Sequence, residues 1–255
     1  GGEGGGRSSC EVALELLWLA MDQSKECRQA FFEADGVKAV VSVLTKATRD
    51  DRMPACLAAA TLRTACINCA ENRAALVEHG GIASLLSYLS QEAQAMKDGL
   101  PESIAVHPAT DYAWTGTEHA LAAINNGCCA NALNSQAVHS NGGMPVLVAL
   151  LAPENKAKAR EYASLAIVNA CSADAPAPRT RTGLRDREWV PAARDALRAL
   201  MGDVTASENA RKFGAAALHL VQDEKGGKGN EREKMALGGS PPDEKSSTSS
   251  RGSGR

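Results

Sequence analysis

The 255-residue sequence has few aromatic residues, no long apolar run and no excess of charge of one sign. Aromatic residues make up 4%, which argues against a base-stacking surface and against a large β-sandwich core. The 28 Lys and Arg nearly balance the 30 Asp and Glu, so no general attraction to nucleic acid or to an anionic membrane follows. The best apolar run, residues 12–21, is broken by Glu15 and is shorter than the ~18 residues of a membrane span. We therefore expect neither a membrane nor a nucleic-acid partner.

A signal peptide and an initial Met are also missing, and five of the first six residues are Gly. We expect a fragment, a processed product or an incomplete gene product. The eight cysteines show no regular framework spacing and lie within apolar helical patterns. They are typical of buried free thiols in a reducing compartment, which predicts a cytoplasmic or nuclear protein.

Three regions differ in composition. Residues 1–9 form a Gly/Ser linker, and residues 223–255 are almost devoid of apolar side chains, so we expect this tail to be disordered. Residues 10–222 are rich in Ala and Leu with helical spacing, as in the stripe Leu57, Ala60, Leu62 and Ala65. This middle region holds the fold.

The middle region contains three similar segments, each with a short helix, a Gly turn and a second helix: residues 25–44, 71–89 and 135–151. A longer Ala-rich helix precedes each segment, over residues 11–21, 54–68 and 117–132. The turns fall at Gly36, Gly80-Gly81 and Gly142-Gly143, where we expect a positive φ. The spacing is about 44 residues, once residues 91–116 are counted as an insertion. Such a period is typical of HEAT and armadillo arrays.

The string ENRAALVEHGGI of residues 71–82 closely resembles the armadillo repeat consensus, and GGMPVLVALL of residues 142–151 is similar. The armadillo unit has a short helix H1, a second helix H2 and a long helix H3. This resemblance covers residues 10–222. It implies an all-α fold, a right-handed α-solenoid of armadillo-type helical repeats with about 4–5 units. A degenerate last unit has H2 at residues 188–201 and H3 at 207–221, after a Pro- and Arg-rich linker, residues 173–187. An apolar end is expected at residues 11–21.

In armadillo proteins the H3 helices line a concave groove, where an Asn commonly bonds the backbone of an extended peptide. An amide suits this task because it both donates and accepts. The resemblance places Asn126 and Asn169 at that position, and the alternative is that they bond their own helix or water. The matching positions of the other units, also assigned to the peptide-binding groove, are Trp18, Thr64 and His219.

The groove departs from two known armadillo patterns. Importin-α-like proteins carry Trp one turn before each Asn, but this sequence has only Leu and Ala there, so binding of nuclear-localisation signals is not expected. A β-catenin-like groove needs a dense basic row, and only Arg63 and Arg160 are candidates. The ligand class therefore stays open.

Two further segments are candidate interaction sites. The insertion, residues 91–116, carries Tyr112 and Trp114 as possible loop anchors for a partner, unless Trp114 packs on the start of the next H3. Residues 179–198 carry six Arg that could meet RNA phosphates, but acidic residues dilute them and a solvated surface is the alternative.

No catalytic or cofactor motif is present. The pairs Cys66/Cys69 and Cys128-Cys129 lack the further ligands of a zinc site, and no metal or cofactor is expected. We expect a non-catalytic scaffold, a monomer or part of a longer chain, that binds an extended segment of a protein or peptide partner along H3. The alternatives are a regulatory fragment of a larger enzyme, such as a kinase or ubiquitin ligase, and RNA binding.

Overall fold

The structure, a computed structural model, describes residues 7–46, 52–107, 109, 113–172 and 188–222. The chain divides into two units, residues 1–224 and 225–255, and the second lies wholly outside the described residues. The predicted disordered tail, the linker 173–187 and all but residues 7–9 of the predicted N-terminal linker also lie outside them. These three assignments stay predictions.

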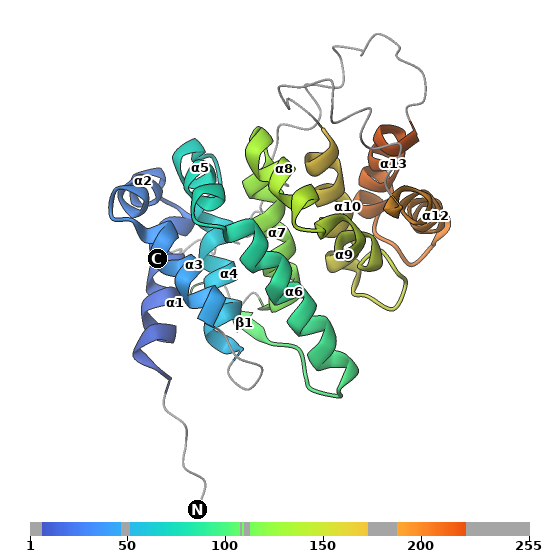
Figure 1. Ribbon diagram of the computed structural model, residues 1–255. Coiled ribbons are helices and arrows are strands. Elements are labelled where there is room, and N and C mark those ends of the chain that lie inside the picture. Colours follow the sequence, from blue (N-terminus) through green and yellow to red (C-terminus); the bar gives the residue numbers. More distant parts are fainter. Residues whose placement is uncertain (1–6, 47–51, 108, 110–112, 173–187, 223–255) are drawn as a thin grey trace, which may run out of the picture. The chain divides into compact units, whose positions relative to one another are not determined.

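Helices make up most of the described chain, as predicted (Figure 1). In chain order they are α1 (Ser9–Asp22), α2 (Lys25–Glu33), α3 (Gly36–Lys46), α4 (Met53–Ala65), α5 (Ala70–Glu78), α6 (Gly81–Lys97), α7 (Gly116–Cys128), α8 (Ala132–Ser140), α9 (Gly143–Ala149), α10 (Ala157–Cys171), α12 (Trp189–Gly202) and α13 (Glu208–Gln222).

The helices pack in three parallel series, one for each position in the armadillo unit. The H3 helices α1, α4, α7, α10 and α13 each contact the next, the H2 helices α3, α6, α9 and α12 do the same, and so do the H1 helices α2, α5 and α8. Each unit therefore buries its apolar side chains against its neighbours, which is how a solenoid forms one continuous core. The predicted α-solenoid is confirmed, and α12 and α13 lie where the last H2 and H3 were expected.

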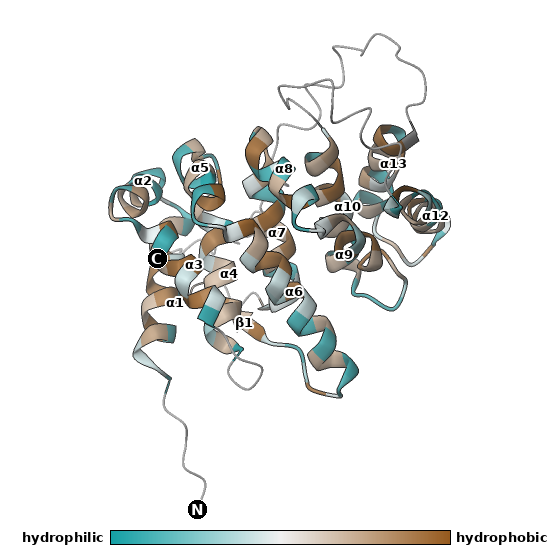
Figure 2. Ribbon diagram, viewed as in Figure 1, coloured by the Kyte–Doolittle hydropathy of each residue, from teal (hydrophilic) through white to brown (hydrophobic). Residues whose placement is uncertain are grey.

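The inner H3 helices are buried on nearly every side. Almost all residues of α4 and α7 are buried, and Figure 2 shows α4 as largely apolar. Alanine suits such a position because a helix with small side chains can lie close to a neighbour on each side. By contrast, α1 has a described H3 neighbour on one side alone, and Leu16 is 61% exposed. The expected apolar end is present.

The turn between H1 and H2 has a positive φ in each of the three units. In two units it lies at Gly80 (φ 69°) and Gly142 (φ 67°), as predicted. In the first unit the prediction of Gly36 was wrong by one residue, because the positive φ lies at Asp35 (φ 55°) and Gly36 begins α3. Asp is one of the few non-Gly residues that adopt this conformation readily.

The residue after the turn must be small for a different reason. A Cβ on Gly81 would lie 2.3 Å from Cδ1 of Leu76, and one on Gly36 would lie 2.4 Å from the ring of Phe31. H2 thus begins in direct contact with a large H1 side chain. The double glycine of the motif serves backbone conformation at its first position and close packing at its second.

Two buried Asn side chains hold successive H1 helices together. Nδ2 of Asn72 donates to the carbonyls of Arg28, in the preceding H1, and Ala65, in the preceding H3, both at 2.9 Å. Asn134 makes the same pair of bonds one unit later, at 2.7 and 2.9 Å. Each Asn therefore links its own H1 to the preceding H1 and to the carbonyl end of the preceding H3.

The insertion has structure of its own, which the all-α prediction did not include. Its first residues, 91–97, extend α6. Strands β1 (Ile104–Val106) and β2 (Ala113–Thr115) then form an antiparallel hairpin in which Ala105 pairs with Trp114. β2 leads directly into α7, whose first turn is closed by a capping box between Thr115 and Glu118.

Candidate functional site

The five predicted groove residues lie at matching positions on successive H3 helices, but they differ in accessibility. Asn126 and Asn169 are half-buried and His219 is exposed. Trp18 is 1% exposed and Thr64 is fully buried, with its hydroxyl donating to the carbonyl of Ala60 in its own helix. The expectation that Trp18 and Thr64 line an open surface is therefore corrected: in this structure both belong to the core.

The two Asn side chains join neighbouring H3 helices. Nδ2 of Asn126 donates to the carbonyl of Arg63 in α4 at 3.0 Å. Nδ2 of Asn169 donates to Oδ1 of Asn125 in α7 at 2.6 Å. Both bonds connect an H3 to the preceding one, an arrangement that neither sequence alternative included. A role of these amides in peptide binding stays a prediction.

The β1–β2 hairpin packs on the H3 helices through Trp114. The indole is 7% exposed, and its ring centroid lies 4.2 Å from Cζ of Arg63 in α4 and 4.1 Å from Nζ of Lys158 in α10. It stacks on His119 of α7 at 5.3 Å and lies 5.2 Å from the ring of Tyr162 in α10. The idea of Trp114 as an exposed anchor is therefore corrected. The alternative, packing on the start of the next H3, is what the structure shows, and Tyr112 lies outside the described residues.

The other strand of the hairpin leads to His107, which packs on α1. Its ring centroid lies 4.8 Å from that of Trp18, nearly perpendicular to it, and Nε2 lies 3.8 Å from Oδ2 of Asp22. Burial lowers the pKa of His107, which Asp22 partly opposes. The imidazole is therefore neutral at neutral pH. The hairpin thus reaches H3 helices of four successive units.

Between the two contacts lies His119, which is fully buried. Its ring is 5.1 Å from that of Trp18, and neither ring nitrogen has a hydrogen-bond partner among the described residues. Burial first, and then the positive charges of Arg63 and Lys158, hold its pKa well below the ordinary value. A neutral imidazole therefore lies under the hairpin.

The base of the hairpin is fixed by Glu92, a fully buried residue of α6. Its carboxylate accepts hydrogen bonds from Nη1 of Arg52 at 3.1 Å, from the hydroxyl of Ser103 at 2.9 Å and from the Ser103 backbone N–H at 3.3 Å. Arg52 also donates to the carbonyl of Pro101 at 2.7 Å, and the N–H of Gly116 donates to the carbonyl of Ser103 at 2.7 Å. These bonds fix the segment before β1 to α6, and the Gly116 bond fixes the residue after β2 to the same segment.

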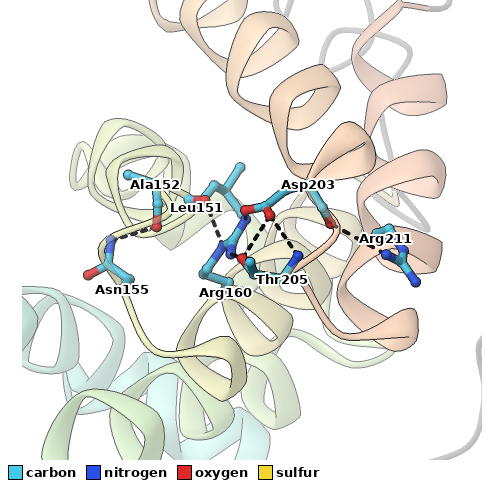
Figure 3. Close-up of polar contacts among 7 residues, drawn as sticks. All are labelled: Leu151, Ala152, Asn155, Arg160, Asp203, Thr205 and Arg211. Carbon is cyan, nitrogen blue, oxygen red and sulfur yellow. Dashed lines mark hydrogen bonds and ion pairs between the residues drawn. The ribbon is translucent and has the colours of Figure 1, made fainter.

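The basic residues predicted for H3 are engaged within the fold. Figure 3 shows Arg160 of α10 between two partners: it donates to Oδ2 of Asp203 at 2.6 Å and to the carbonyl of Leu151 at 3.1 Å. Hydrogen bonds from Thr205 and Arg160 lower the pKa of Asp203 to about 2. Arg160 therefore fixes the last unit to the array, and Arg63 lies against Trp114.

The Arg-rich segment is only partly described. Its residues 179–187 lie outside the described residues. Within α12, Arg194 donates to the carbonyl of Val221 at 3.2 Å, and Arg198 pairs with Asp195 at 3.4 Å. RNA binding through this segment stays a prediction.

The cysteines are free thiols. Burial raises the pKa of Cys66 and of Cys128 to about 12, so both are protonated and poorly suited to ligate a metal. Among the described residues no three His, Cys, Asp or Glu side chains gather as metal ligands would. Within the same residues no helix has the length and apolar character needed to cross a bilayer.

The described helices form an armadillo-type α-solenoid. No family model and no curated protein matches the chain. The armadillo repeats only protein of Plasmodium falciparum is similar in structure, with a TM-score of 0.58 at 14% identity, covering 83% of this chain and 79% of that one. A designed armadillo repeat protein in complex with the peptide (KR)4 has a TM-score of 0.50 at 19% identity, over 83% and 92%. A structure of computationally designed armadillo repeat proteins for modular peptide recognition has a TM-score of 0.50 at 20% identity, covering 82% of this chain and 92% of that one. These similarities establish the armadillo fold.

The contact residues that the sequence did not bring together are those under the hairpin: His107, His119 and Lys158. A signal was present in the alternation of small and large residues around Trp114, but each strand has only three residues. An alternation over three residues is too short to distinguish a strand from a loop in the sequence.

Proposed function

We propose that this chain is a protein-interaction scaffold that binds an extended segment of a partner protein along its H3 helices. The observation that carries the proposal is that these helices already hold an extended strand, β2 of the chain itself, by its Trp114 side chain. A surface that accommodates one extended segment has the shape and chemistry to accommodate another. The designed armadillo protein whose structure contains the peptide (KR)4 supports the same mode of binding.

The partner segment would run across the H3 helices near Arg63, His119 and Lys158, and could reach Asn126, Asn169 and His219. Trp18 and Thr64 are buried and would not touch the partner; they would support the surface residues by packing beneath them. No residue of this surface is assigned a chemical step, so we propose a binding protein and not an enzyme. A reducing compartment, cytoplasm or nucleus, fits the eight free thiols.

A peptide-display selection tests the proposal. The full chain is used, beside a variant in which residues 104–114 are replaced by a Gly/Ser segment of equal length, here named the opened variant. Selected peptides are then measured against Lys158→Glu, on the H3 surface, and against Lys38→Glu, the same charge change on an exposed residue of α3. Helix content of all variants is compared by circular dichroism.

We expect Lys158→Glu to weaken binding about ten-fold or more, as for a central interface residue, and Lys38→Glu to leave it unchanged. If no peptide binds either form of the chain, or if both charge reversals have equal effects, the H3 surface is not the binding site.

A further inference from the structure

The β1–β2 hairpin is an addition to the repeat and not part of it. Residues 47–52 join α3 to α4 and residues 150–156 join α9 to α10, whereas residues 98–115 make the corresponding connection between α6 and α7. Despite belonging to one unit, the hairpin contacts α1 through His107 and α10 through Trp114. It therefore lies across the surface that successive H3 helices build together.

The position of Trp114 has the features of a site for an aromatic side chain. A guanidinium and an ammonium lie within about 4.2 Å of the centroid of its ring, from Arg63 and Lys158. His119 stacks on the indole with an interplanar angle of 25°, and Tyr162 is tilted at 43°. Cations near a ring favour an electron-rich aromatic group, and Trp above all. The four residues come from three H3 helices and would remain if the hairpin left.

The contact beneath the hairpin is incompletely satisfied. Nε1 of Trp18, Nε2 of His107 and both ring nitrogens of His119 are buried without a hydrogen-bond partner among the described residues. Burial of unsatisfied polar atoms costs free energy, which is recovered when water reaches them.

The isolated hairpin would have little stability of its own. Two strands of three residues are not stable alone in water. Their inward side chains are Ala105 and Trp114, while Ile104 and Val106 face outward and are about half exposed. Beyond its base at Glu92, the hairpin is held mainly by docking of side chains on H3. The H3 helices beneath it also pack directly on one another.

We propose that the hairpin is an internal ligand of the H3 surface, and that a partner segment binds by placing an aromatic side chain, Trp in first place, where Trp114 now lies. The partner displaces the hairpin, so the chain is held in a closed state until a competing segment is present. This proposal rests on the proposed function, because it assigns the partner chemistry and the regulation of the same surface.

A synthetic peptide with the sequence of residues 102–116 tests the proposal, with fluorescence anisotropy as the readout. We expect the opened variant to bind this peptide at least about ten-fold more tightly than the wild-type chain, in which the site is filled. A matched peptide with Trp114→Ala should lose about ten-fold or more, and one with Trp114→Phe should be intermediate. Equal binding of the peptide to both forms of the chain, or equal binding of the Trp and Ala peptides, would overturn the proposal.

A second measurement needs no variant and decides the matter if the opened variant loses helix content. Hydrogen exchange of the wild-type chain should show the β1 and β2 amides exchanging about a hundred-fold or more faster than the amides of α7, through opening of the hairpin alone. Exchange of both sets only by global unfolding would overturn the proposal. If the opened variant binds peptides from the display selection but not the hairpin peptide, the proposed function stands and the internal-ligand proposal fails.

Discussion

Replacement of Glu92 by Gln tests how the base of the insertion is held. Three groups donate hydrogen bonds to the carboxylate: Arg52, the Ser103 hydroxyl and the Ser103 N–H. A Gln side chain has the same shape but offers one acceptor and one donor. In one orientation its NH₂ group faces Arg52, and in the other it faces the Ser103 N–H. Each orientation therefore brings two donors together and removes the negative charge opposite Arg52.

The expected cost follows from these contacts. A buried hydrogen bond to a charged group contributes about 1.5–3 kcal/mol, and breaking a buried ion pair costs about 3–5 kcal/mol. Because Arg52 keeps its bond to Pro101, we expect Glu92→Gln to lower the free energy of unfolding by about 3 kcal/mol. For a domain of this size that is a fall in Tm of about 6–12 °C.

Urea unfolding followed by far-ultraviolet circular dichroism measures this loss. The control is Glu78→Gln in α5, which makes the same chemical change at an exposed residue and should alter stability by less than about 0.5 kcal/mol. A Glu92→Gln chain as stable as the control would refute the role given to this carboxylate.

Three further outcomes are expected. While the hairpin lies on H3, burial lowers the pKa of His107 and His119, so the chain takes up protons more readily once the hairpin is released. Hydrogen exchange of the β1 and β2 amides, corrected for the intrinsic exchange rate, should therefore accelerate as the pH falls below the ordinary His pKa of 6.5. Gly81→Ala should cost about 1–3 kcal/mol in urea unfolding because its Cβ would overlap H1, whereas Gly202→Ala, with open space around it, should not destabilise the chain. Asn134→Ala should cost about 1–3 kcal/mol in the same assay, since the hydrogen bonds to the carbonyls of Arg73 and Gly127 are lost.

The sequence predicted the repeat because each part of the motif has a local physical cause. Gly80 and Gly142 are required by backbone conformation and Gly81 by contact with H1, and these requirements recur in the three units whose H1–H2 turn is described. The first turn was assigned to Gly36 because composition alone does not show which of two neighbouring residues takes the positive φ. Asp35 takes it, and Gly36 serves packing.

The candidate site was less accessible from sequence, because its residues meet through tertiary contacts of the insertion. The resemblance to armadillo repeats placed Trp18 and Thr64 on the H3 helices but could not show that they are buried. Trp114 was recognised as an unusual residue in a long connection. Its neighbours Arg63 and Lys158 come from helices 51 residues before it and 44 residues after it, and no local pattern links them.

The most direct test of the account is hydrogen exchange of the wild-type chain with and without a saturating peptide from the display selection. The account predicts faster exchange of the β1 and β2 amides in the complex, together with added protection of α4, α7 and α10, because the peptide replaces the hairpin on H3. A peptide that binds while the hairpin amides keep their protection would contradict it.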